Sequence, residues 1–221
     1  MQENTKEKSF FRLTFGRVLI IIMAAAVLVQ IALMNRLLEE NKLRDQKIAQ
    51  QEAQIKELKK KLQIKDAIKE HQMGLSSEEI TQLADVIYLE SKRYVFDPLL
   101  IMAVIMTESS FKKNQVSDYG AQGLMQIMPS TAEGVARRMG LTWPSEFGLH
   151  DPALNVRLGV NYLFELILKF GSLKRGMLAY NMGESVLSEY DFYKAEPPPA
   201  FYNKVVKNYR SLKSKYGDAV R

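Results

Sequence analysis

The sequence of 221 residues contains no cysteine and only two histidines, His71 and His150. Without cysteine there is no disulfide, no thiol nucleophile, no thiolate metal site and no lipid anchor attached through that residue. Neither histidine lies in an H-E-x-x-H motif, and no G-x-S-x-G motif marks a serine nucleophile. These absences exclude most metal-dependent and serine hydrolases, and we expect neither a metal nor a cofactor.

The excess of positive charge lies in the N-terminal third of the chain. The formal net charge is +6. Residues 1–74 hold 14 Lys or Arg and 9 Asp or Glu, whereas residues 75–221 hold 17 and 16. A protein that follows a phosphate backbone needs basic residues gathered on its folded domain. We therefore do not expect nucleic acid as a partner.

An apolar segment, residues 18–34 (VLIIIMAAAVLVQIALM), contains no charge and one polar residue, Gln30. As a helix it extends roughly 25 Å, at the short end of the membrane-spanning range. Its small residues, 24–26, stand in the middle of the run rather than after it, which favours an uncleaved anchor over a signal peptide. Basic residues outnumber acidic ones in segment 1–17, which predicts a cytoplasmic N-terminus and a C-terminal part outside.

Residues 35–74 are rich in Gln, Glu and Lys and reach their first glycine at Gly74. Five positions repeat every seven residues, and all except Asn41 are apolar: Met34, Asn41, Ile48, Ile55 and Leu62. Of the five positions three residues later, only Leu37 and Leu58 are apolar; the other three are Arg44, Gln51 and Lys65. A coiled coil, which would make a homo-oligomer through residues 35–72, and an isolated charged helix both remain open. Either would form a spacer of roughly 57 Å.

Residues 75–221 are predicted to form an all-α domain. Ser76 and Glu79 fit a capping box, apolar residues follow at helical spacing, and no segment alternates like a strand. Helices are expected near residues 77–94, 98–109, 130–140, 152–169, 172–181 and 199–216.

A glutamate, Glu108, ends a helix that begins with the D-P pair at 97–98 and is wholly apolar over residues 99–106. A carboxylate there is poorly solvated and faces the negative end of the helix dipole, and both effects raise its pKa. A carboxylic acid that stays protonated near neutral pH can protonate a leaving oxygen, as a glycosidase requires. Taken alone, Glu108 could equally cap the helix or pair with Lys112 or Lys113.

Two further segments carry side chains suited to sugars. In the loop 117–129 (SDYGAQGLMQIMP) two glycines three residues apart allow close backbone approach, and Gln126 can both donate and accept hydrogen bonds. At 179–183 (AYNMG), Tyr180 stands beside Asn181 at the end of a helix. An ordinary glycine-rich connection and a buried tyrosine would also account for these segments.

Together these segments resemble a known family. The runs DPLLIMAVIMTESSF, SDYGAQGLMQIMP and AYNMG are similar, in this order, to the three motifs of the soluble lytic transglycosylases, whose fold is related to goose-type lysozyme. Segments 151–163 and 198–216 also match, so the resemblance covers about residues 78–216. It implies an all-α, goose-type-lysozyme-like domain over residues 75–221, preceded by the transmembrane helix and the spacer.

The resemblance also implies roles for single residues. Glu108 would be the sole catalytic acid and base, and Tyr180 would orient it. The substrate-binding residues would be Ser117, Met125, Gln126, Tyr180 and Asn181. Two positions depart from the family pattern, because Gly176 stands where alanine is usual and Met182 where a small residue is usual.

The implied substrate is the glycan strand of peptidoglycan. Glu108 would protonate the oxygen between N-acetylmuramic acid and N-acetylglucosamine, then accept the C6 hydroxyl proton as a 1,6-anhydro ring closes. No second carboxylate would be needed, unlike in the usual glycosidase pair. The implied location is the bacterial cytoplasmic membrane, with the catalytic domain on the outer, periplasmic side.

Two alternatives remain. A hydrolase of the lysozyme type would use water as the acceptor and needs a second carboxylate, for which Asp118 and Asp151 are the candidates. A non-catalytic scaffold would bind glycan without cutting it, although an intact Glu108, Gln126 and Tyr180 speak against that reading.

Overall fold

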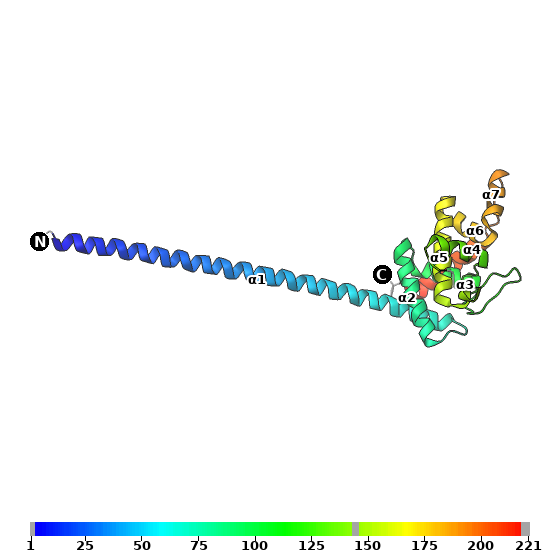
Figure 1. The fold of residues 1–221 in the computed structure, drawn as a ribbon, viewed down its shortest axis with the longest axis horizontal. Coiled ribbons are helices and arrows are strands. Elements are labelled where there is room, and N and C mark those ends of the chain that lie inside the picture. The colour runs from blue at the N-terminus through cyan, green and yellow to red at the C-terminus, as the bar shows by residue number, and fades with distance from the viewer. Residues whose placement is uncertain (1–2, 143–145, 218–221) are drawn as a thin grey trace. The chain divides into compact units, whose positions relative to one another are not determined.

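A computed structural model describes residues 3–142 and 146–217 of the chain. Helices account for nearly all of this part (Figure 1): α1 (Glu3–His71), α2 (Ser77–Tyr94), α3 (Pro98–Glu108), α4 (Pro129–Arg138), the 3-10 turn η1 (Glu146–His150), α5 (Pro152–Phe170), α6 (Leu173–Met182), α7 (Glu184–Phe192) and α8 (Ala200–Tyr216). Within these residues, β pairing is limited to three isolated bridges in loops. The predicted all-α class is confirmed.

Local capping chemistry sets several helix ends where the sequence predicts them. Ser76 and Glu79 form the reciprocal capping box at the start of α2. Asp97 accepts a hydrogen bond from the main-chain N–H of Leu99, with Pro98 at the first helical position of α3. Helix α7 and turn η1 were not expected from the sequence. Helix α7 buries one residue, Leu187, so it shows no apolar period to find.

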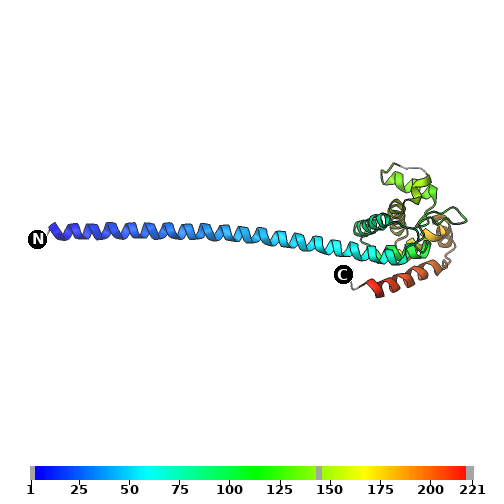
Figure 2. The ribbon, with the colours of Figure 1, turned by 90° about the horizontal axis from the view of Figure 1, so that it is seen from below.

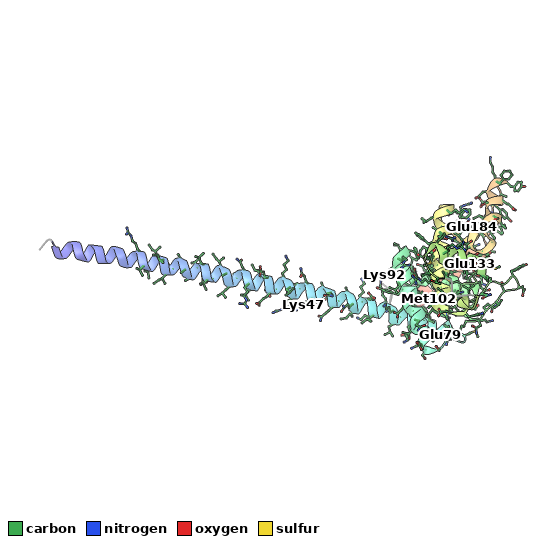
Figure 3. All side chains as sticks on the ribbon, in the orientation of Figure 1. Lys47, Glu79, Lys92, Met102, Glu133 and Glu184 are labelled. Atoms are coloured by element: carbon green, nitrogen blue, oxygen red, sulfur yellow. The ribbon has the colours of Figure 1, made fainter. Side chains whose placement is uncertain are left out.

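The described residues divide into two compact units, Met1–Lys56 and Glu57–Arg221. In the first unit the chain is helical from Glu3 on, and residues 17–56 are exposed, as Figure 3 shows around Lys47. The helix is long and apolar enough to cross a membrane by length and composition, with a window of mean hydropathy 2.6. The predicted anchor and spacer are thus parts of one helix; of segment 1–17, residues 1–2 lie outside the described residues.

The second unit begins at Glu57, whereas the sequence analysis places the domain boundary at residue 75. The last turns of α1 supply three fully buried core residues: Ile64, Ala67 and Ile68. Figure 2 shows α8 beside these turns, and Tyr216 of α8 donates a hydrogen bond to Glu70 over 2.6 Å. The C-terminal end of the predicted spacer therefore belongs to the domain core, because its apolar face packs there.

Helix α3 runs through the middle of this core, as its uniformly apolar sequence predicts. Its residues from Ile101 to Ile105 are all at most 1% exposed, and Met102 lies deep within the crowded body of the unit in Figure 3. Helices α2 and α8 pack against α3, and α5 packs against both α2 and α6. The end of α3, with Glu108, is therefore held by the surrounding helices.

Candidate active site

Glu108 is the last residue of α3, at a sharp change of chain direction. Two and three residues later, Ser110 (φ 53°) and Phe111 (φ 59°) both adopt the left-handed region that non-glycine residues rarely occupy. Phe111 is fully buried, and its carbonyl oxygen accepts a hydrogen bond from the N–H of Met73 over 3.1 Å. The burial of Phe111 and this hydrogen bond compensate for the backbone strain directly after the end of α3.

Desolvation dominates the electrostatics of Glu108. Burial raises the pKa of its carboxyl group to about 8, against a smaller lowering by the Lys204 ammonium group. That group donates a hydrogen bond to the main-chain oxygen of Thr107 over 3.3 Å. Within the described part of the chain, the Glu108 carboxyl group itself has no hydrogen-bonding or ion-pairing partner. It is therefore an uncommitted acid that stays protonated at neutral pH.

The structural alternatives for Glu108 are not realised. Lys113 pairs with Glu79 at the start of α2 instead, and Lys112 is exposed. The C-terminal end of α3 is satisfied by other groups, because the Ser109 N–H bonds to the Ile105 oxygen over 2.9 Å. Glu108 is needed neither as a cap nor as an ion-pair partner.

The loop after Glu108 is folded back on itself. Around Ser117, the hydroxyl oxygen accepts a hydrogen bond from the Ala121 N–H over 3.0 Å, and the Ser117 N–H bonds to the Ala121 oxygen. Gln126 has a φ of 47° and donates its amide N–H groups to the main-chain oxygens of Gln115 (3.0 Å) and Gly123 (2.8 Å). Both residues thus shape the loop, and the side-chain oxygen of Gln126 remains the group available to a ligand.

A buried asparagine of α5, Asn155, anchors this loop and was given no role from the sequence. Its side chain accepts from the Met125 N–H (2.8 Å) and donates to the main-chain oxygens of Gln122 (2.9 Å) and Leu149 (3.2 Å). A Cβ on Gly123 would lie 2.2 Å from the Asn155 amide nitrogen, so this position requires glycine. The signal in the sequence was a polar residue on an otherwise apolar helical face.

Tyr180 joins α6 to the loop. Its hydroxyl group donates a hydrogen bond to the main-chain oxygen of Met125 over 2.8 Å. Burial, then the charge of Glu108, raises the pKa of Tyr180, so the phenol lies within electrostatic reach of the carboxyl group. Gly159 of α5 permits this approach, because a Cβ there would lie 3.0 Å from the Tyr180 oxygen and 2.7 Å from the Met125 sulfur.

The remaining predicted site residues differ in exposure. The side chain of Met125 is fully buried in the core, so this residue offers the site its main chain rather than its side chain. Asn181 is exposed at the end of α6. Tyr180 is thus bonded to Met125 and lies within electrostatic reach of Glu108, while Ser117 and Gln126 belong to one loop. Among the described residues, no group of three or more His, Asp or Glu side chains could hold a metal ion.

The departure at Gly176 has a packing reason. A Cβ there would lie 2.5 Å from the Ile167 side chain and 2.9 Å from the main-chain nitrogen of Ile167. Helices α5 and α6 therefore approach too closely for the alanine that is usual in the family. The half-buried Met182, at the other departure, packs against buried residues of α5 to α7.

The helical unit has the architecture of known lytic transglycosylases. The 70 kDa soluble lytic transglycosylase SLT70 from Escherichia coli superposes with a TM-score of 0.54 at 23% sequence identity, over 60% of this chain and 24% of that one. The described unit is thus a lysozyme-like helical domain. Residues 85–198 match the model of the Transglycosylase SLT domain family, and the chain belongs to that family.

Two curated relatives extend the comparison. The chain is 33% identical over 130 residues to a transglycosylase of Enterobacteria phage PRD1, covering 59% of this chain and 44% of the relative. It is 38% identical over 112 residues to membrane-bound lytic murein transglycosylase C of Mannheimia succiniciproducens, covering 46% and 31%. The chain therefore spans less than half the length of either relative.

Proposed function

We propose that this chain is a lytic transglycosylase that cleaves the bond between N-acetylmuramic acid and N-acetylglucosamine in peptidoglycan and forms a 1,6-anhydro ring. The observation that carries the proposal is the state of Glu108, an unpaired carboxyl group with a pKa of about 8 in a protein of this family. At neutral pH it holds the proton that the leaving oxygen needs.

The reaction balances with one carboxyl group. Glu108 gives its proton to the glycosidic oxygen as the bond from that oxygen to the muramyl C1 breaks. The resulting carboxylate then takes the proton of the muramyl C6 hydroxyl group, whose oxygen bonds to C1. Glu108 is protonated again, and no water is consumed.

The positions of other carboxylates favour this route over hydrolysis. Asp151, one candidate for holding a water molecule, is engaged as the N-cap of α5 and accepts from the Leu154 N–H over 2.7 Å. Asp118, the other candidate, is exposed in the loop that Ser117 closes. Neither has the buried setting that would hold a nucleophilic water molecule opposite Glu108.

The neighbouring residues form the saccharide groove in this proposal. Gln126 presents its amide oxygen, and Ser117 fixes the turn beside it. Tyr180 holds the Met125 carbonyl and contributes to the setting of Glu108. The exposed amide of Asn181 can both donate to and accept from the substrate.

We further propose that the chain is anchored in the bacterial cytoplasmic membrane by residues 18–34, with residues 1–17 inside and the catalytic unit outside. The apolar window in α1 and the membrane-bound relative support this assignment. Residues 35–56 then form a spacer. Exposed heptad side chains, such as Ile48 and Ile55, support its pairing with a second copy of the chain.

Mass spectrometry of digested peptidoglycan tests the function. We expect products ending in 1,6-anhydro-N-acetylmuramic acid and their loss, by about 10²–10⁴-fold, with Glu108→Gln. Reducing ends instead would establish a hydrolase. A folded wild-type protein that binds peptidoglycan and releases nothing would establish a scaffold.

A further inference from the structure

The end of α7 presents two aromatic side chains that are nearly uncovered. Phe192 is 80% exposed and Tyr193 75% exposed. Their rings meet edge to face, with centroids 5.1 Å apart. Scattered apolar residues on a surface are ordinary, whereas an exposed cluster marks an interaction site. The pair therefore needs a partner or a ligand to explain it.

The two rings border a hollow of about 860 Å³ whose other walls are polar. The polar side chains come from α5 and α7: Lys169, Glu184, Ser185, Ser188 and Glu189. They offer carboxylate groups that accept hydrogen bonds, an ammonium group that donates them and hydroxyl groups that can do either. A sugar ring has the complementary surfaces, because its C–H face packs on an aromatic ring while its hydroxyl and amide groups form hydrogen bonds at the edge.

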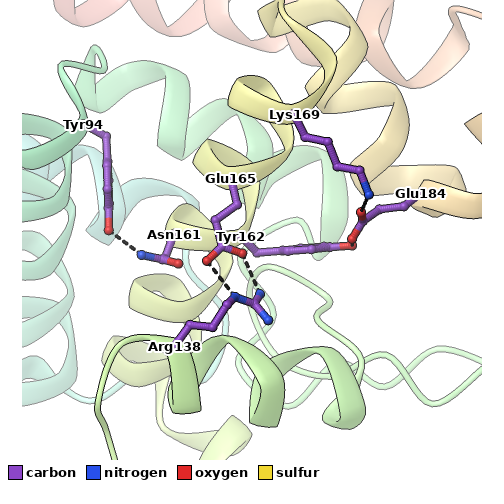
Figure 4. A network of polar contacts seen from close by, with 7 residues as sticks. All are labelled: Tyr94, Arg138, Asn161, Tyr162, Glu165, Lys169 and Glu184. Atoms are coloured by element: carbon purple, nitrogen blue, oxygen red, sulfur yellow. Dashed lines mark hydrogen bonds and ion pairs between the residues drawn. The ribbon is translucent and has the colours of Figure 1, made fainter. Parts of the chain in front are cut away.

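Polar contacts hold both ends of α7 in place. At its start, Glu184 accepts from Lys169 (2.5 Å) and from the Tyr162 hydroxyl group (3.2 Å), as Figure 4 shows. At its end, Asp191 pairs with Arg175 of α6. A surface that is already fixed loses little conformational freedom on binding. The rings are therefore presented on a preorganised support.

A chain of side-chain contacts links a wall of the hollow to the candidate active site. Tyr162, which contacts Glu184 on one side, packs its ring against Tyr180 on the other, with centroids 5.5 Å apart. Tyr180 in turn lies within reach of the charge of Glu108. Two aromatic side chains, Tyr162 and Tyr180, thus separate the hollow from the candidate acid, and a glycan strand long enough to pass both could reach the rings.

Resting on the proposed function, we propose that Phe192 and Tyr193 form a platform that binds the glycan strand outside the catalytic groove. The local charge favours this occupant over a membrane surface. Segment 184–196 holds four acidic residues and one basic residue, which would repel an anionic bilayer but not N-acetylglucosamine, which is uncharged, or a muramyl residue whose carboxyl group is amide-linked to a stem peptide.

Binding to insoluble peptidoglycan tests the platform with the full chain in detergent micelles. The parent is Glu108→Gln, so that the substrate is not consumed, and the test variant adds Phe192→Ala and Tyr193→Ala. The matched control adds Leu89→Ala, an exposed apolar side chain of α2. Cosedimentation is measured with purified peptidoglycan and with the same material after enzymatic removal of its stem peptides.

We expect the double substitution to raise the Kd about tenfold on both materials and the control to leave it unchanged. An unchanged Kd, or no binding by the parent, overturns the platform. A loss confined to peptide-bearing material assigns the rings to peptide binding and also overturns it. Self-association that disappears with the rings, seen by analytical ultracentrifugation, would assign the surface to a second copy instead.

Turnover separates this proposal from the proposed function. In the otherwise wild-type chain, removal of both rings should raise KM for peptidoglycan about tenfold and retain kcat. Anhydro products with an unchanged KM would keep the function and reject the platform. Ring-dependent binding without any anhydro product would reject the function and keep the platform.

Discussion

The hydroxyl group of Tyr180 donates its hydrogen bond to the main-chain oxygen of Met125, 55 residues earlier in the chain. The family resemblance predicts that Tyr180 orients Glu108; in the structure its hydroxyl group holds the loop that contains Met125, and the phenol lies within electrostatic reach of Glu108. Because the donated proton goes to Met125, the phenol oxygen keeps its acceptor capacity for the protonated Glu108 carboxyl group. One side chain thus joins α6 to the loop and lies within electrostatic reach of the acid.

Tyr180→Phe should lower both stability and turnover. The buried Met125 carbonyl would lose its partner, which costs about 1–3 kcal/mol in the free energy of unfolding. Turnover should fall clearly at a temperature where both proteins are fully folded, because the loop that contains Met125 and the candidate substrate-binding residue Gln126 loses its tie to α6. Thermal unfolding and release of anhydro products measure the two effects. An unchanged turnover would make Tyr180 a purely structural residue.

The pH profile of turnover should follow Glu108. The pKa of about 8 in the folded protein keeps the acid active below that value, and kcat should fall as the pH rises through it. Lys204 lowers this pKa, so Lys204→Gln should move the falling limb to higher pH. Lys207→Gln, at an exposed position of the same helix, is the matched control. A falling limb that moves to lower pH with Lys204→Gln, or that moves equally in both variants, would contradict the assignment of this limb to Glu108.

Local chemistry explains what could be read from the sequence. The capping box at Ser76 and the N-cap at Asp97 depend on neighbouring residues, and the burial of α3 follows from its uninterrupted apolar run. The raised pKa of Glu108 follows from that burial. The resemblance to the family supplied the identity of the other candidate residues.

The features that could not be predicted from the sequence depend on contacts between distant segments. The partners of Asn155 lie up to 33 residues away, and no local pattern announces them. The sequence around Ile64 and Ile68 is charged and rich in glutamine, so its narrow apolar face is not recognised as core until α2 and α8 are seen to pack against it. Main-chain geometry at Ser110 and Phe111 is likewise imposed by packing.

Asn155→Ala should destabilise the loop of the candidate site. It removes three hydrogen bonds to buried main-chain groups, for which we expect a loss of roughly 3 kcal/mol or more in the free energy of unfolding. Asn155→Asp retains the contact with the Met125 N–H but sets a buried carboxylate oxygen against the Gln122 and Leu149 oxygens, so at neutral pH it should destabilise the fold at least as much. Urea denaturation ranks the variants, and equal stability of all three proteins would contradict this account.

Gly176→Ala should destabilise the fold although alanine is usual at this position. The new Cβ would meet the Ile167 main chain, which cannot yield without separating α5 from α6, at a cost of about 1–3 kcal/mol. Gly134→Ala is the matched control. It meets only the flexible end of Arg138 at 3.3 Å and should gain about 0.5–1 kcal/mol in helix propensity. Equal melting temperatures for the two variants would refute the packing argument.

The last turns of α1 should be required for a stable catalytic unit. A fragment of residues 57–221 keeps Ile64 and Ile68, whose burial contributes about 1.5–3 kcal/mol each, whereas a fragment of residues 75–221 lacks both. Since a domain of this size is stable by about 5–15 kcal/mol, the shorter fragment should unfold at much lower denaturant concentration or fail to fold.

Single substitutions in the 57–221 fragment distinguish the loss of core packing from the effect of shortening the N-terminus. Ile68→Ala, at a fully buried site, should cost about 2–5 kcal/mol, while Leu62→Ala, at a site 56% exposed on the same helix, should change stability by less than about 0.5 kcal/mol. Circular dichroism during urea denaturation measures both. Equal midpoints for the 57–221 and 75–221 fragments would place the boundary back at residue 75, because α1 would then add no core.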